Sequence, residues 1–207
     1  KFLNIKCRKA GLVPSCVVIV ATIRALKMHG GVEKEDLKKE DVEALKRGLV
    51  NLERHIENIK KFGLEPIVAI NHFVLDTKSE INTVLNFCKQ KRVQVSECRH
   101  WAKGGNGATD LAKKVVVACN KRKNKFSFLY KDNLKLWDKN EIIAKQIYKA
   151  SKITANDEVK NQLREFEKNG HKHLPVCIAK TQYSFSTDPK NKGCLLYTSD
   201  AADEHSW

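Results

Sequence analysis

The sequence contains no long hydrophobic run. Its longest apolar stretch, from Cys16 to Ala21, is six residues long, whereas a helix that crosses a bilayer needs about 20. It also lacks a charged segment followed by an apolar one at its start, so we expect no secretory signal. Asn-x-Ser/Thr glycosylation sites are absent as well. These absences predict a protein with no membrane partner that works in the cytoplasm, with the mitochondrion as the alternative compartment.

The seven cysteines are odd in number and contain no Cys-x-x-Cys pair. A structural zinc site and a thioredoxin-like redox centre both rely on such pairs, and neither is indicated. Several of the cysteines lie in apolar strands or on apolar helix faces, where a free thiol behaves as a small hydrophobic group. We expect reduced thiols, in line with an intracellular compartment.

Two signatures of phosphate binding are missing. No Gly-x-x-x-x-Gly-Lys-Ser/Thr loop occurs, and Gly105-x-Gly107 lacks the third glycine of a dinucleotide fingerprint because Asp110 stands there. The pair His171-x-His173 has no Cys, Asp or Glu nearby at metal-ligand spacing. We therefore expect no metal site among these residues and interpret both histidines as surface residues.

Positive charge is plentiful, with a formal net charge of +15, and this predicts anionic partners. Nucleic acid is the first such partner to consider, but the lysines are scattered and often stand beside acids, as in Glu33 to Arg47. The densest cluster, Lys121 to Lys125, is interpreted as a connecting loop. We expect no nucleic-acid partner. The alternative is a non-catalytic basic α/β module that binds nucleotide or RNA, which would need a basic stripe with interleaved aromatic residues.

Strand and helix signals alternate along the chain, which favours βαβ units around a parallel sheet. With 42% hydrophobic residues the chain can bury a sizeable core. The predicted fold class is α/β, a parallel sheet with helices on both faces. The expected strands are 16–21, 67–71, 93–98, 126–130 and 174–179. The expected helices are 42–59, one that begins with the capping box Thr77-Lys78-Ser79-Glu80, one that carries Leu111, Val115 and Cys119, and the segments 142–148 and 159–166.

Three segments fall where this sheet predicts a ligand site, since open α/β sheets bind ligands beyond the carboxyl ends of their strands. Phe73 follows one strand, and from the residues alone its packing into the core is the favoured interpretation. The segment Lys103-Gly104-Gly105 precedes a helix and suits an anion or a plain turn about equally. The third segment, after the first strand, contains Arg24, Lys27, His29, Gly30 and Gly31. Its two cations suit phosphate oxygens, and the alternative is a charged helix start followed by a Gly-Gly turn.

Three sequence blocks, read in order, identify a resemblance. They are Val20-Ala21-Thr22-Ile23-Arg24-Ala25-Leu26-Lys27-Met28-His29-Gly30-Gly31, His100-Trp101-Ala102-Lys103-Gly104-Gly105 and Ile178-Ala179-Lys180-Thr181-Gln182-Tyr183-Ser184-Phe185-Ser186. Together they resemble formate–tetrahydrofolate ligase. The resemblance covers residues 1–193 as the central, folate-binding part of the ligase. It implies a P-loop NTPase-like or Rossmann-like sheet, incomplete at both ends. Residues 194–207 do not match and are interpreted as a non-native read-through tail.

The resemblance assigns roles that the residues alone leave open. It implies that Phe73 and Trp101 sandwich the pterin ring of tetrahydrofolate, and that Lys103, Gly104 and Gly105 face the anionic intermediate. Val74 stands where the family often has Pro or Lys, so a special backbone geometry associated with that proline is not expected. The block of Arg24, Lys27, His29, Gly30 and Gly31 becomes part of the nucleotide cleft, and Lys180 to Ser184 line the same cleft or face water.

By resemblance, the reaction joins formate to tetrahydrofolate through formyl phosphate, consumes ATP with magnesium, and yields 10-formyltetrahydrofolate. Implied partners are formate, ATP and tetrahydrofolate polyglutamate, within a homo-oligomeric full-length enzyme. The family's ATP-phosphate loop lies upstream of these residues, so we expect the chain alone to be inactive. No catalytic acid or base is assigned. Lys1 to Arg8 resemble the eukaryotic branch of the family, in which this domain is part of a larger one-carbon enzyme.

Overall fold

The computed structural model describes residues 1–120 and 125–178. They form two compact units. One unit comprises Pro14–Phe126, and the other combines Lys1–Val13 with the residues from Ser127 onward. Residues 121–124 of the predicted basic loop, residues 179–186 of the third sequence block and the predicted tail at 194–207 lie outside the described residues.

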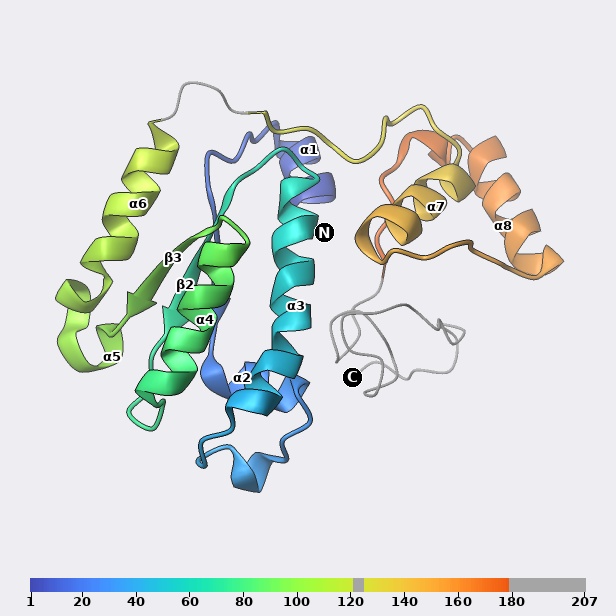
Figure 1. Ribbon diagram of the computed structural model, residues 1–207. Helices are drawn as coiled ribbons and strands as arrows, with labels where there is room; N and C mark the ends of the chain where they lie inside the picture. The colour runs from blue at the N-terminus through green and yellow to red at the C-terminus, as the bar shows by residue number, and fades with distance from the viewer. Residues whose placement is uncertain (121–124, 179–207) are drawn as a thin grey trace. The chain divides into compact units, whose positions relative to one another are not determined.

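The first unit contains a three-stranded parallel sheet in the order β1-β2-β3 (Figure 1). Its strands are β1 (Val17–Ala21), β2 (Pro66–Asn71) and β3 (Gln94–Cys98). The register pairs Ile19 with Val68 and Val68 with Val95. The helical segments are α2 (Ile23–His29), η2 (Lys34–Asp36), α3 (Val42–Lys60), α4 (Lys78–Gln90), α5 (His100–Lys103), η3 (Gly104–Ala108) and α6 (Thr109–Cys119). The three strands predicted within this unit are confirmed.

One face of the sheet carries the hydrophobic core. Alternate strand residues point to opposite faces, and on this face Val68 and Ile70 pack against apolar side chains of α2, α3 and α4. On the other face, Ser96 donates a hydrogen bond to Asp110 of α6 at 2.6 Å. The prediction of a parallel sheet with helices on both faces is confirmed. On the α6 face Val20 of β1 remains 65% exposed.

Both long helices of the core begin as their sequences predict. Asp41 caps α3 by accepting a hydrogen bond from the amide of Ala44 at 2.8 Å. At the start of α4, the Thr77 hydroxyl accepts from the Glu80 amide and the Glu80 carboxylate accepts from the Thr77 amide, which completes a capping box. Such reciprocal bonds satisfy amides that the first helical turn leaves without partners.

The second unit is helical in the part described. It contains η1 (Phe2–Cys7), α1 (Arg8–Ala10), α7 (Leu136–Ile147), α8 (Asp157–Lys168) and η4 (His171–His173). The two predicted helices of this region are confirmed as α7 and α8, although both begin earlier in the structure than in the predicted segments 142–148 and 159–166. Both histidines of η4 are exposed, as expected.

The two strands predicted at 126–130 and 174–179 are wrong for the residues described, since neither 126–130 nor 174–178 is extended in a sheet. Side chains take the backbone hydrogen bonds that a sheet would have used. The Leu129 amide donates to Asn4 Oδ1 at 3.2 Å, Arg8 donates to the Tyr130 carbonyl at 2.7 Å, and the Val176 amide donates to the Tyr130 hydroxyl at 3.1 Å. An apolar aromatic run resembles a strand in sequence, but these long-range partners decide its structure.

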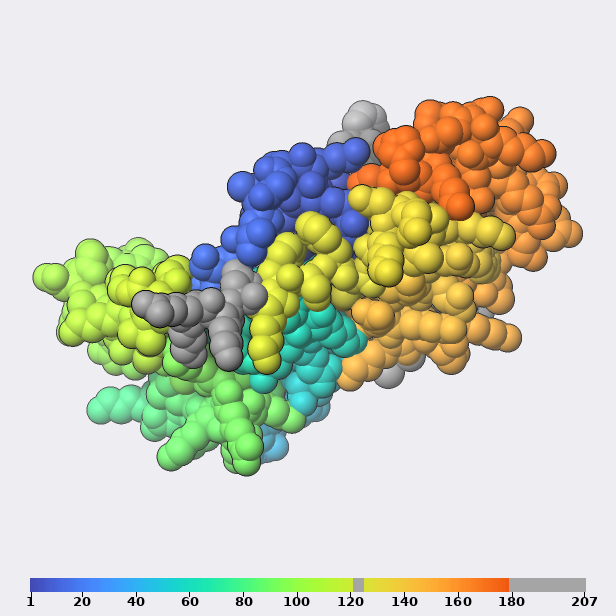
Figure 2. Space-filling model, turned by 90° about the horizontal axis from the view of Figure 1, so that it is seen from above, coloured from blue at the N-terminus to red at the C-terminus, as the bar shows by residue number. Residues whose placement is uncertain are grey.

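Among the described residues, no helix is long and apolar enough to span a bilayer. The strands point toward the end of the first unit at which α2 and α5 lie (Figure 1). Figure 2 looks onto the opposite end, where residues of α3, α4 and α6 reach the surface. The predicted ligand site therefore belongs to the end of the sheet that faces away from the viewer in Figure 2.

Candidate functional site at the carboxyl end of the sheet

Two loops that carry the predicted ring residues leave the sheet side by side. Phe73 follows β2, and Trp101 lies on α5 directly after β3. The two strands are neighbours in parallel register, and beyond them the His72 amide donates a hydrogen bond to the Cys98 carbonyl at 3.0 Å. The loops of Phe73 and Trp101 thus start from adjacent points on the same edge.

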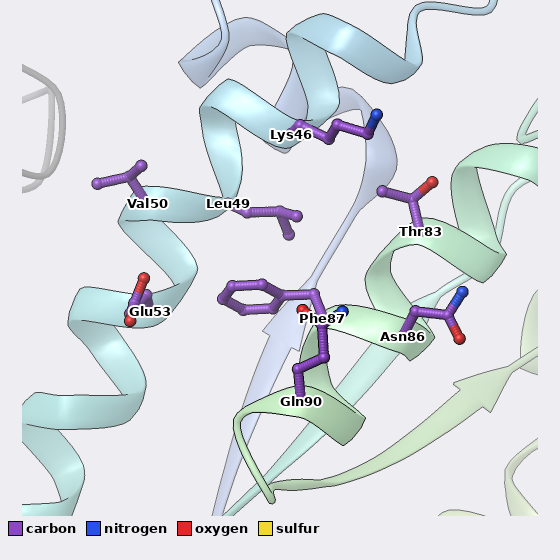
Figure 3. A pocket seen from close by; sticks show the side chains of 8 residues that line it. All are labelled: Lys46, Leu49, Val50, Glu53, Thr83, Asn86, Phe87 and Gln90. Atoms are coloured by element: carbon purple, nitrogen blue, oxygen red, sulfur yellow. The ribbon is translucent and has the colours of Figure 1, made fainter.

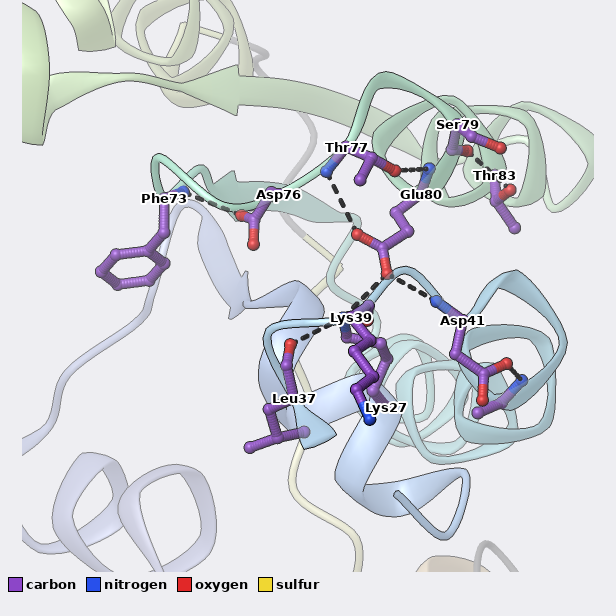
Figure 4. Close-up of polar contacts among 11 residues, drawn as sticks. Lys27, Leu37, Lys39, Asp41, Phe73, Asp76, Thr77, Ser79, Glu80 and Thr83 are labelled. Atoms are coloured by element: carbon purple, nitrogen blue, oxygen red, sulfur yellow. Dashed lines mark hydrogen bonds and ion pairs between the residues drawn. The ribbon is translucent and has the colours of Figure 1, made fainter. Parts of the chain in front are cut away.

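The Phe73 loop is closed by a short hydrogen bond. Asp76 Oδ2 accepts from the Phe73 amide at 2.8 Å, and burial raises the pKa of the Asp76 carboxyl above its ordinary value. The Phe73 ring is half-buried and is not part of the hydrophobic core. Figure 4 shows this ring turned away from the buried polar cluster around Glu80.

Arg24 connects the first predicted segment to this loop. Its guanidinium carbon lies 5.3 Å from the centre of the Phe73 ring, a distance at which a cation is attracted to the face of an aromatic ring. The structure therefore brings together a residue predicted for the nucleotide cleft and a residue predicted for the folate wall.

Trp101 projects into solvent, with 68% of its surface exposed. Lys103, Gly104 and Gly105 follow it and are exposed too. Gly104 has φ +55°, in a region that favours glycine. An exposed indole beside an exposed cation on one short segment suits a ligand that combines an aromatic ring with negative charge.

Lys27 occupies a different environment from Arg24, since it is only 2% exposed. Its ammonium donates to the carbonyls of Leu37 and Lys39, both at 2.8 Å, and pairs with Glu80 Oε1 at 2.9 Å (Figure 4). These three contacts use all the donors of a lysine. A role in the nucleotide cleft stays a prediction for Lys27, while the geometry favours a structural one.

The remaining members of that segment also differ in their surroundings. A Cβ on Gly30 would lie 1.8 Å from the Ala44 carbonyl oxygen, so this glycine allows α2 to approach α3 closely. Gly31 has φ +98° and turns the exposed chain away from α2, and His29 is half-buried. Their roles in nucleotide binding remain predictions.

Glu97, at the end of β3, contacts both ring-bearing loops. Its Oε1 lies 2.6 Å from His72 Nδ1 and accepts from Arg99 Nε at 2.6 Å. These three residues line a pocket of about 210 Å³ together with Lys78, Ile81 and Asn82. At the end of β2, Asn71 Oδ1 is buried without a hydrogen-bond partner in the described part of the chain.

A larger pocket, of about 430 Å³, lies between α3 and α4 (Figure 3). It is lined by Lys46, Leu49, Val50, Glu53, Thr83, Asn86, Phe87 and Gln90. None of these residues belongs to the predicted site. The chemistry predicted from the sequence therefore points to the carboxyl end of the sheet and not to this pocket.

Comparison with known proteins assigns the chain to a family. The family model of formate–tetrahydrofolate ligase matches residues 1–196. The chain belongs to the formate–tetrahydrofolate ligase family. It is 58% identical over 193 residues to the formate–tetrahydrofolate ligase of Pelagibacter ubique, and 54% identical over the same length to those of Rhizobium rhizogenes and Ruegeria sp.. Each match covers 93% of this chain and 34 to 35% of the relative.

The chain of this ligase-family member thus spans about a third of the length of these curated relatives. The relatives named here are bacterial, and the expected affinity with the eukaryotic branch stays a prediction. The family match runs three residues past Gly193, where the sequence resemblance was expected to end.

Sequence reasoning missed the contacts that Glu97 makes with His72 and Arg99. They join residues at the ends of two neighbouring strands, and no local motif indicates such contacts. A signal was nonetheless present. Glu97 lies two residues after Val95 and therefore on the same, core-facing side of the strand, and a charged residue at such a position needs a partner.

Proposed function

We propose that the chain forms the folate-binding part of a formate–tetrahydrofolate ligase that converts formate, ATP and tetrahydrofolate to 10-formyltetrahydrofolate, ADP and phosphate. The observation that carries this proposal is the family match over nearly the whole chain. The sheet edge, with an aromatic residue on each of two adjacent loops, supports it.

The reaction has two steps. A formate oxygen attacks the terminal phosphorus of ATP, ADP leaves, and formyl phosphate forms. The N10 amine of tetrahydrofolate then attacks the formyl carbon, the bond from carbon to the phosphate oxygen breaks, and phosphate leaves while the amine loses a proton. No described residue is assigned as the base that accepts this proton.

The contribution proposed for this chain is to position the pterin. Phe73 and Trp101 would stack on its two faces, which combines apolar burial with a preferred orientation of the rings. Holding the amine against the acyl phosphate replaces an encounter in solution with a reaction inside one complex. Among the groups nearby, Arg24, Lys103 and the amides of Gly104 and Gly105 suit the negative charge of the intermediate.

The proposed reaction uses ATP and magnesium. The described residues suit contact with a phosphate group but not the binding of the metal. Within residues 1–120 and 125–178, no group of three or more His, Cys, Asp or Glu side chains is placed to hold a metal ion. We therefore assign no magnesium ligand to these residues and derive no step through the metal. Arg24 is the residue that we propose contacts a phosphate group.

Several further properties belong to the proposed full-length enzyme. It would work in the cytoplasm as a homo-oligomer, with formate, ATP and tetrahydrofolate polyglutamate as ligands and without nucleic acid. The basic surface would attract the folate tail, because positive charge raises the local concentration of anions.

A chimeric enzyme tests the proposal. Residues 1–193 of this chain replace the matching third of the Pelagibacter ubique ligase, which is 58% identical there, and the formation of 10-formyltetrahydrofolate is measured. We expect activity in the chimera and none in the isolated chain. Phe73→Ala or Trp101→Ala should raise KM for tetrahydrofolate about tenfold or more, because each removes a stacking partner.

Two results would contradict the proposal. One is a folded, inactive chimera. The other is binding of single-stranded RNA by the isolated chain, with no response to tetrahydrofolate, which would favour the basic-module alternative. The Glu43→Gln variant is the matched control for both ring variants, because Glu43 is an exposed residue at the start of α3, and its KM should equal that of the unsubstituted chimera.

A further inference from the structure

Glu97 joins the two loops that carry the predicted pterin-binding rings. Its Oε1 lies 2.6 Å from Nδ1 of His72, the residue before Phe73. The same oxygen accepts a hydrogen bond from Nε of Arg99 at 2.6 Å, two residues before Trp101. One carboxylate therefore holds both loops close to the point at which they leave the sheet.

The backbone of Arg99 is hydrogen-bonded to the segment that carries Trp101. The Arg99 amide donates to the Gly107 carbonyl at 2.9 Å, and the Arg99 carbonyl accepts from the amides of Ala102 and Lys103 at 3.0 and 2.9 Å. A Cβ on Gly107 would lie 2.4 Å from the carbonyl carbon of Arg99. Because the start and the end of the loop both close on Arg99, a shift of Arg99 moves the short helix that carries Trp101.

The charge on Glu97 is suited to this task. Burial alone would raise the pKa of its carboxyl, but the hydrogen bonds from His72 and Arg99 outweigh that effect and leave the pKa below its ordinary value. The carboxylate is therefore ionised at neutral pH, and hydrogen bonds to an ionised acceptor are stronger than bonds between neutral groups.

We propose that Glu97 is a positioning residue that sets the separation of Phe73 and Trp101 by holding His72 of one loop and Arg99 of the other. It does not touch the substrate. It acts through its two partners, and it determines how much of the stacking energy of the two rings a flat pterin can use. This inference rests on the function proposed above, since it assumes that the two rings bind one ligand.

A positioning role differs from a merely structural one in what a substitution changes. The side chain of Glu97 is 27% exposed, and the residue is not part of the hydrophobic core of the unit. Its removal should therefore leave the fold intact and alter the affinity for tetrahydrofolate, whereas a structural residue would change the stability first.

The test uses the fluorescence of Trp101 in the 207-residue chain, with Trp137→Phe and Trp207→Phe in the background so that a single tryptophan emits. Tetrahydrofolate is titrated into the background chain and into Glu97→Gln and Glu97→Ala. The expected dissociation constant rises about threefold for Glu97→Gln, which keeps one acceptor oxygen, and about tenfold for Glu97→Ala, which keeps none. The exposed Glu43→Gln variant is the control and should bind as the background does.

A second pair of variants tests the partner of Glu97. His72→Gln keeps an N–H donor and should bind within about twofold of the background, whereas His72→Leu removes the donor and should match Glu97→Ala. Since the two side chains act through one contact, the double variant His72→Leu/Glu97→Ala should bind no more weakly than the weaker single variant. In the chimeric enzyme, Glu97→Ala should raise KM for tetrahydrofolate and leave KM for ATP unchanged.

The outcomes separate this inference from the proposed function. If the background chain does not respond to tetrahydrofolate and the chimera is inactive, the proposed function fails. If the background binds and Glu97→Ala binds equally well, only the positioning role fails. Loss of the cooperative unfolding transition in Glu97→Ala would also overturn the positioning role, because it would show that Glu97 supports the fold itself.

Discussion

Replacing Lys27 with methionine would leave one of the most buried carboxylates of the chain without its cation. Glu80 is 0% exposed and Lys27 is 2% exposed. In the variant, the carbonyls of Leu37 and Lys39 lose their 2.8 Å contacts with the ammonium. Glu80 keeps the amides of Asp41 and Thr77, at 3.2 and 3.1 Å, which do not neutralise its charge.

The expected loss in free energy of unfolding at pH 7 is about 3–5 kcal/mol, the range typical for removing one partner of a buried ion pair. Hydrogen bonds to charged groups contribute about 1.5–3 kcal/mol each, so three lost contacts account for this loss even after local relaxation. Because domains of this kind are stable by only about 5–15 kcal/mol, the variant should unfold at a much lower urea concentration.

The dependence on pH provides a second check. In the unsubstituted chain, burial alone would raise the pKa of Glu80, but hydrogen bonds from Lys27 and two amides outweigh it and the pKa lies below its ordinary value. This contribution to stability is present above the unfolded-state pKa of about 4.3 and is lost as the pH falls through the folded-state pKa. Without Lys27 the carboxyl should instead favour protonation, so the difference between the two chains should narrow as the pH falls from 7 to 5.

Urea denaturation followed by circular dichroism measures both quantities, and the slope of the transition shows whether the unfolded state has changed. Lys46→Met is the matched control, because Lys46 forms an exposed ion pair with Glu43, which should contribute less than about 1 kcal/mol. A loss below about 1 kcal/mol for Lys27→Met, with an unchanged slope, would refute the account of the buried pair.

Three further outcomes are expected in the same unit. Gly30→Ala should lower the free energy of unfolding by about 2 kcal/mol or more, because its Cβ would lie 1.8 Å from a carbonyl oxygen of α3; thermal unfolding at the wild-type temperature would contradict this. Asp110→Ala should lower the free energy of unfolding, measured by urea denaturation, by about 1–3 kcal/mol, because it leaves the 1% exposed Ser96 hydroxyl without its acceptor. Asp110→Asn keeps an acceptor oxygen and should recover most of that loss. Burial raises the pKa of Cys88 to about 11. Iodoacetamide should therefore label exposed Cys119 in the native chain and Cys88 only after unfolding. Equal labelling rates of the two thiols in the native chain would contradict this expectation.

The sequence predicts the elements of this fold wherever local signals agree with tertiary packing. The β-branched run before Ala21 becomes β1, and the capping box at Thr77 starts α4. Phe126 to Tyr130 has the same apolar character as a strand, but its partners are Asn4 and Arg8, more than a hundred residues away in sequence. Local strand propensity carries no information about partners so distant in sequence, and for this reason the strand predicted at 126–130 was wrong.

In the candidate site, too, the sequence predicts where residues lie along the chain but not which way their side chains face. Phe73 and Trp101 were predicted because they follow strand ends and match a family pattern; both lie at the expected end of the sheet, and their role stays a prediction. Lys27 has the sequence context of a phosphate ligand, yet its ammonium is buried against Glu80. A residue after a strand faces either the ligand or the next helix, and only the three-dimensional packing decides which.

A crystal structure of the chain in complex with tetrahydrofolate would show directly where the pterin binds. We predict the pterin between the rings of Phe73 and Trp101, with Glu97 still bonded to His72 and Arg99. A pterin bound elsewhere on the chain, or a Phe73 ring packed into the core in the complex, would contradict this prediction.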